Sequence, residues 1–283
     1  MFGSTVLDLV LGILFSFLII SLVTSTITEA IASAVGWRAN TLLGGIKDLL
    51  NDRTFTGLAQ SIYRHAAVNP LDDGTPKTEA NLQFKPSYID PKQFAGALID
   101  VLNLAPAAGA TVTVAGLQNQ ITSSTLLNDQ LKTMLTGIVT RTGGNVNRIR
   151  DELATWFDSG MDRVAGSYKR KTQKWGFWIA VLCAIALNID IVKIAEALWD
   201  QPILMKGFSV SAGQLPQDVL DQAQQLGLPF GWGPAAITYA QCWQHWPYMI
   251  AGWAIAAVAT LFGAPFWFDA LQKFVQLRGA GSK

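Results

Sequence analysis

The sequence has few charged residues and few of the side chains that most often carry catalytic or metal chemistry. Only 14% of its 283 residues are charged, against about a quarter in an ordinary soluble domain, whereas 50% are hydrophobic. A net charge of +1 excludes a strongly basic nucleic-acid-binding protein, and ten tryptophans with a mean hydropathy of +0.29 exclude a disordered or collagen-like chain. Two histidines, two cysteines and no complete catalytic signature favour a protein that is not an enzyme and holds no cofactor.

Three long apolar runs indicate membrane-spanning helices, because each approaches the roughly 20 residues that a bilayer core requires. We expect these helices within residues 1–37, 175–199 and 247–269. The leader before the first run lacks Lys and Arg, and Asp8 precedes the run, which disfavours a cleaved signal peptide. The predicted fold is therefore an all-α integral membrane protein with three transmembrane helices.

The distribution of Lys and Arg predicts the orientation, because basic residues stay on the cytoplasmic side. Sixteen of the 21 lie in residues 38–174, one lies in 200–246 and three lie in 270–283. We expect the N-terminus outside, 38–174 as a helical cytoplasmic domain, 200–246 as a small extracytoplasmic segment and 270–283 as a cytoplasmic tail. The expected location is the bacterial inner membrane.

Periodicity and turn residues place the elements within these parts. The first span is expected to continue as one helix to about Asn51, and the last helix of the cytoplasmic domain to run from about Val146 directly into the second span. A kink is expected at Gly263. Further helices are expected over 55–66, 90–103, 126–142 and 216–226, with an irregular loop over 67–90.

Four polar residues interrupt the second span: Asn188, Asp190, Lys193 and Glu196. Charges inside a span are costly, so they raise a functional hypothesis by default. The stripe could line an ion pathway. Alternatively it is an interhelical ion-pair cluster near the outer interface, with Lys193 extending outward.

A second charged set lies where the predicted spans meet the cytoplasm: Glu29, Arg38, Asp158, Asp162, Arg163 and Asp269. Its carboxylates could hold a divalent cation through oxygen ligands, or they could pair with nearby basic residues and fix helix packing. The basic run before the second span could contact anionic lipid headgroups through Lys169, Arg170, Lys171 and Lys174.

The histidines and cysteines predict no shared site. His65 and His245 fall on opposite sides of the predicted membrane, so they cannot jointly ligate a metal or a haem. Cys183 and Cys242 differ too much in depth to form a disulfide within one chain. Pairs of small residues four apart in all three spans, such as Gly252 and Ala256, favour close helix association.

Three stretches resemble a group of bacterial polytopic inner-membrane proteins to which no activity is attached. They are 156–173, with the pattern WFDxxMDRxxGxYKRxxQ, the ALNID of 186–190, and 263–281, which begins GAPFWFDxL. Residues 86–100 fit the same pattern. The resemblance implies a bacterial cytoplasmic-membrane protein and implies no catalytic residue.

We prefer the hypothesis of a non-enzymatic membrane scaffold or accessory subunit that oligomerises or docks a partner at the inner membrane. Its expected partners are membrane lipids and a second copy or another membrane-complex protein, and not nucleic acid. One alternative is an oligomeric channel lined by Asn188, Asp190 and Lys193, or by the hydroxyl face of the first span. That hydroxyl face consists of Ser16, Ser21, Thr24, Ser25 and Thr28. The other alternative is an enzyme acting at the inner leaflet through Asp158, Asp162 and Asp269.

Overall fold

The computed structural model of this chain describes residues 2–105, 113–200 and 231–280, which form helices, turns and loops with no strand among them. They divide into two compact units, 33–170 and the combination of 1–32 with 171–283. We call the first the helical domain and the second the apolar unit. The all-α prediction is confirmed for these residues, whereas the helix expected over 216–226 lies outside them.

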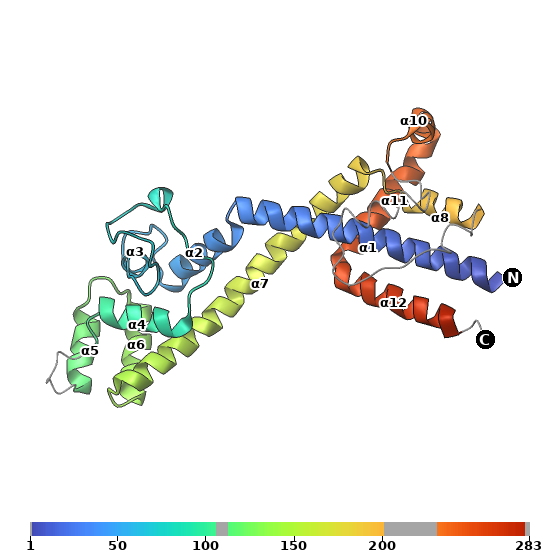
Figure 1. Cartoon of the computed structure of the whole chain (residues 1–283). Coiled ribbons are helices and arrows are strands. Elements are labelled where there is room, and N and C mark those ends of the chain that lie inside the picture. Colours follow the sequence, from blue (N-terminus) through green and yellow to red (C-terminus); the bar gives the residue numbers. More distant parts are fainter. Residues whose placement is uncertain (1, 106–112, 201–230, 281–283) are drawn as a thin grey trace. The chain divides into compact units, whose positions relative to one another are not determined.

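The apolar unit holds most of the apolar helix segments of the described chain, and Figure 1 labels its helices. Two candidate spans, Leu9–Ala34 and Trp243–Phe262, are long and apolar enough to do so, and a third is present if the helix pair bent by 48° between Ala186 and Ile191 counts as one span. A membrane protein is thus supported. The unit's helices are α1 (Phe2–Ala34), the end of α7 (Val146–Ala186), α8 (Ile191–Asp200), α10 (Pro234–Gln241), α11 (Trp246–Ala259) and α12 (Ala264–Ala280).

The structure has helix breaks at three places, near Gly36, Asn188 and Gly263. The expected continuous helix to Asn51 is wrong, because α1 ends at Ala34 and Gly36 takes a left-handed φ of 64°. The second span is interrupted at Asn188, whose φ is 45°; Asn is among the few residues that tolerate this region. The break expected at Gly263 is confirmed, with a φ of 81° there, so the apolar helix ends at Phe262 rather than continuing to 269.

The helical domain packs short helices against the first half of α7 around its own apolar core. At the centre of this core, the rings of Phe94 and Phe157 stack with centroids 3.9 Å apart. Gly160 allows α7 to approach α2 closely, since a Cβ at this position would lie 2.9 Å from Leu49 Cδ1. The other helices are α2 (Trp37–Leu49), α3 (Leu58–Tyr63), the short η1 (Glu79–Asn81), α4 (Pro91–Val101), α5 (Val114–Ser123) and α6 (Asp129–Arg141).

Side-chain caps determine where these helices start. The predicted start at Asp90 is confirmed, because its carboxylate accepts N–H bonds from Lys92 and Gln93 and Pro91 occupies the first helical position. The Asn128 side chain caps α6 in the same way. Thr113 caps α5, a helix that the small-residue stretch before it did not indicate.

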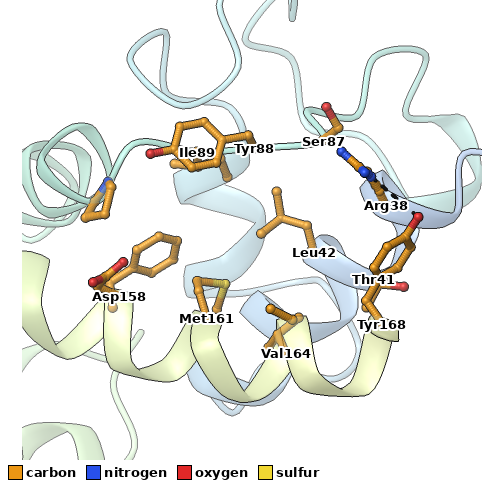
Figure 2. Close-up of a pocket in the computed structure, with 13 residues that line it drawn as sticks. Arg38, Thr41, Leu42, Ser87, Tyr88, Ile89, Asp158, Met161, Val164 and Tyr168 are labelled. Carbon is orange, nitrogen blue, oxygen red and sulfur yellow. Dashed lines mark hydrogen bonds between the residues drawn. The ribbon is translucent and has the colours of Figure 1, made fainter. Parts of the chain in front are cut away.

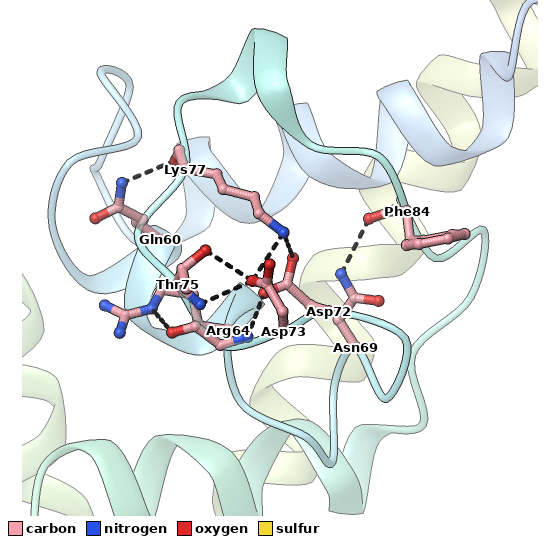
Figure 3. Close-up of polar contacts among 9 residues, drawn as sticks. Gln60, Arg64, Asn69, Asp72, Asp73, Thr75, Lys77 and Phe84 are labelled. Atoms are coloured by element: carbon pink, nitrogen blue, oxygen red, sulfur yellow. Dashed lines mark hydrogen bonds and ion pairs between the residues drawn. The ribbon is translucent and has the colours of Figure 1, made fainter.

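The loop predicted over 67–90 is irregular apart from η1, and side chains hold it (Figure 3). The Lys77 ammonium lies 2.9 Å from Asp73 Oδ1 and 3.3 Å from Asp72 Oδ2, and the Asp72 side chain is only 1% exposed. Bonding to Lys77 and to Thr75 holds the pKa of Asp73 well below its usual range. Because one lysine pairs with both aspartates, this loop is a structural ion-pair network.

Asp52 fastens the turn between α2 and α3. Its Oδ2 accepts N–H bonds from Gly57 and Ala59 at 2.8 and 3.0 Å, and its Oδ1 accepts one from Thr56 at 3.1 Å. These bonds hold Phe55 at a φ of 57°, a strained conformation for a bulky residue, with its ring buried. Burial alone raises the pKa of Asp52, but the N–H bonds outweigh it and place the pKa below its ordinary value of 3.8.

Asp52→Ala is therefore expected to lower the free energy of unfolding of the helical domain by about 1 kcal/mol at neutral pH. A depressed carboxyl pKa contributes stability that is present above the unfolded value, about pH 4, and is lost as pH falls through the folded value. The gap between wild type and variant should then narrow below about pH 4 in denaturant titrations. Asp151→Ala, at an exposed carboxylate on α7, is the control; an equal loss there would contradict the capping role.

Candidate functional site

A groove of about 280 Å³ opens on the helical domain between α2, α7 and the segment just before α4 (Figure 2). Its walls are mostly apolar, with Leu42 from α2, Ile89 from the connecting segment and Met161 from α7. Tyr88 lies at its edge and is 72% exposed. Concave apolar surfaces of this kind are where proteins most often bind other molecules.

Charged groups occupy the two ends of this groove. Asp158 lies at one end and Arg38 at the other (Figure 2). Arg38 Nε donates a 3.4 Å hydrogen bond to the Tyr168 hydroxyl, and its guanidinium carbon lies 5.7 Å from that ring's centroid. The tyrosine thus orients the guanidinium, while the Asp158 side chain is exposed.

A second hollow, about 190 Å³, lies inside the apolar unit. Ser21, Thr24 and Thr28 of α1 line it on one side and Thr172 of α7 lines another. The hydroxyl oxygens of these four residues are buried and have no hydrogen-bond partner. We call this hollow the hydroxyl cavity; Ser25, Glu29, Gln173, Gly176, Phe177, Thr260, Leu261 and Gly263 complete its wall.

The predicted intramembrane cluster is distributed around the break between α7 and α8. Asn188 is 1% exposed; its amide donates to the Gly231 carbonyl at 3.0 Å and its oxygen accepts from Trp253 Nε1 at 3.3 Å. Asp190 is 2% exposed, and its Oδ1 accepts the N–H groups of Val192 and Lys193 at 3.0 and 3.3 Å. Asp190 thus satisfies backbone N–H groups at the start of α8, whereas Asn188 connects the break to Gly231 and Trp253.

The other two members of this cluster, Lys193 and Glu196, lie on α8. The Lys193 ammonium lies 4.1 Å from the centroid of the Tyr239 ring, a cation–π contact, and Glu196 is exposed. The interpretation of the stripe as the lining of an ion pathway stays a prediction.

The second charged set falls in different places. Arg38 and Asp158 share the groove, Arg163 borders a neighbouring hollow of about 430 Å³ beside Asp48, and Asp162 is exposed on α7. Glu29 lines the hydroxyl cavity, and Asp269 is exposed on α12. Among the residues described, no three His, Cys, Asp or Glu side chains gather closely enough to hold a metal ion.

The basic run before the second span is exposed on α7; it consists of Lys169, Arg170, Lys171 and Lys174. The expectation that these residues contact lipid headgroups stays a prediction. Cys183 and Cys242 are both free thiols, as expected.

Sequence reasoning missed several residues that form these sites. Tyr88 and Thr172 lie in the stretches 86–100 and 156–173, but nothing in those stretches marked them as site residues, since their role depends on contacts with segments far away in the sequence.

No protein-family model, curated protein or solved structure matches this chain. The resemblance based on residues 156–173, 186–190 and 263–281 therefore stays a prediction, and the groove and the hydroxyl cavity must be interpreted from their own chemistry.

Proposed function

We propose that this chain is a non-enzymatic membrane scaffold or accessory subunit whose helical domain docks a partner protein at the bacterial inner membrane. The groove between α2 and α7 carries this proposal. It has an apolar floor but a single carboxylate, Asp158, among its lining residues, so it offers a binding surface rather than an acid and base pair.

The charges at the groove's ends specify the chemistry of the partner. An apolar helix fits the floor, with an acidic side chain directed to Arg38 and a basic one to Asp158. Binding of an apolar helix in such a groove is a common mode of peptide recognition. The occupant we propose is therefore an amphipathic helix of a partner protein.

We also propose three spans, with the bent pair of α7 and α8 crossing as one. From Trp175 to the end of α7 at Ala186 there is roughly 18 Å of helix, too short for a core of about 30 Å, and α8 supplies about the length that is missing. This count, with sixteen of 21 basic residues in 38–174, supports an outside N-terminus and a cytoplasmic helical domain.

Photo-crosslinking from the groove tests the docking function. With p-benzoylphenylalanine in place of Tyr88, intact cells are expected to give one discrete adduct, because this side chain lies at the groove's edge and is 72% exposed. Charge reversal by Arg38→Glu or by Asp158→Lys should lower the yield about tenfold, which corresponds to about 1.4 kcal/mol of binding. Mass spectrometry of the adduct distinguishes a different protein from a second copy of this chain.

The matched control places the same crosslinker at Leu71, a 68% exposed residue of the same domain outside the groove. Equal adducts from both positions, or yields that neither charge reversal alters, would contradict docking in the groove. A monodisperse, partner-free monomer after extraction in mild detergent would contradict the scaffold function as a whole.

A further inference from the structure

The hydroxyl cavity contains polar groups that the protein itself does not satisfy. Ser21, Thr24 and Thr28 are 2%, 4% and 8% exposed, and neither their hydroxyl oxygens nor that of Thr172 has a hydrogen-bond partner. A buried hydroxyl without a hydrogen-bond partner is costly. Nearly all buried hydroxyls in folded proteins are therefore hydrogen-bonded, to the protein itself or to a bound molecule or ion. Four buried hydroxyls without a partner around one cavity point to an occupant.

Other hydroxyls on α1 behave in the ordinary way. Ser16 donates to the Gly12 carbonyl at 2.8 Å and Thr26 donates to the Leu22 carbonyl at 2.9 Å, the usual arrangement for Ser and Thr in apolar helices. Residues 21, 24 and 28 lie on one helix face at spacings of three and four and lack this bond. Their hydroxyl oxygens are therefore available as ligands on the cavity side.

The chemistry of the wall favours a cation. The lining contains one carboxylate, Glu29, and no Lys, Arg or His. The C-terminal end of α11 also borders the cavity through Thr260, and helix C-termini carry partial negative charge. Hydroxyl and carboxylate oxygens suit hard cations, and a single carboxylate compensates one positive charge rather than two.

We propose that the hydroxyl cavity binds one hard monovalent cation, Na⁺ or K⁺. The hydroxyl oxygens of Ser21, Thr24, Thr28 and Thr172 are its ligands, and the Glu29 carboxylate balances its charge. The site lies within the apolar unit, so this proposal stands independently of docking on the helical domain.

Thermal unfolding of the full chain in mild detergent tests the site. At constant ionic strength, NaCl or KCl is expected to raise the midpoint by several degrees over choline chloride in a saturable way, because a ligand that binds only the folded state stabilises it. Equilibrium dialysis with ²²Na⁺ and ⁸⁶Rb⁺ should give one bound ion per chain. Thr28→Val is expected to weaken binding at least tenfold.

Matched variants separate binding from folding. Thr26→Val, which removes a bonded hydroxyl outside the cavity on the same helix, should leave binding unchanged, and Thr28→Ser should retain it. Glu29→Gln keeps every hydroxyl but should also weaken binding at least tenfold. Identical midpoints in the three salts with no bound radioisotope would show that the cavity holds only water and would overturn the proposal, as would a response to Mg²⁺ or Ca²⁺ alone.

Discussion

Gly252→Ala is expected to destabilise the apolar unit by about 2–4 kcal/mol, the sum of overpacking and loss of a helix cap. A Cβ at this position would overlap Asp190 Oδ1 and would lie 3.2 Å from the Ile191 backbone nitrogen. Since that oxygen caps the first turn of α8, it cannot move away without exposing the N–H groups of Val192 and Lys193. The measurement is the thermal unfolding midpoint in mild detergent.

A double-mutant cycle identifies the cause of this loss. Asp190→Ser shortens the side chain but keeps an oxygen that can cap α8, so Gly252→Ala should cost less in that background than in the wild type. Ala254→Val adds volume at an exposed position of the same helix and should have little effect. If the losses of stability from Gly252→Ala and Asp190→Ser are additive, the added methyl group does not contact the Asp190 side chain directly.

The break between α7 and α8 shows how far the sequence could predict the structure of the second span. Composition marked Asn188 and Asp190 as costly polar residues, but hydropathy averages over a window and indicated one continuous helix. Their effect is local: Asn188 adopts a left-handed backbone and Asp190 caps the next helix. Both side chains suit a helix end better than a helix interior, and this signal could have predicted the break.

The end of α1 illustrates the same limit. The apolar residues of α2 recur at helical spacing after Gly36, so periodicity alone does not register that one helix ends at Ala34 and the next begins at Trp37. The missed helix α5 has the opposite cause, since its cap, Thr113, follows a small-residue stretch without periodicity. Periodicity therefore predicted helix content well and helix ends poorly.

The candidate sites were less predictable than the helices. Arg38 and Asp158 were recognisable as charges near the predicted membrane surface, yet the groove also needs Tyr88 from a third segment. No spacing rule connects residues so far apart in the sequence. The hydroxyl face of α1 was predicted, whereas the absence of backbone bonds at Ser21 and Thr28 depends on three-dimensional packing.

The second large effect is expected in the helical domain, where Phe157→Ala should cost about 3–5 kcal/mol. Phe157 is 1% exposed and Phe94, which stacks on it, is fully buried, so truncation leaves a cavity at the centre of the core. Phe157 also lines the groove, so the variant should crosslink poorly from position 88. Phe84→Ala, at a 47% exposed ring of the same domain, is the matched control and should change stability little.

Hydrogen exchange measured by mass spectrometry can localise this loss. The two units have separate apolar cores, with Phe157 in one and Trp253 in the other. Exchange should therefore rise in peptides from α4 and the first half of α7 and remain unchanged in α11. A comparable rise in α11 would mean that the two cores unfold together, and the groove variants would then have to be judged against the stability of the apolar unit as well.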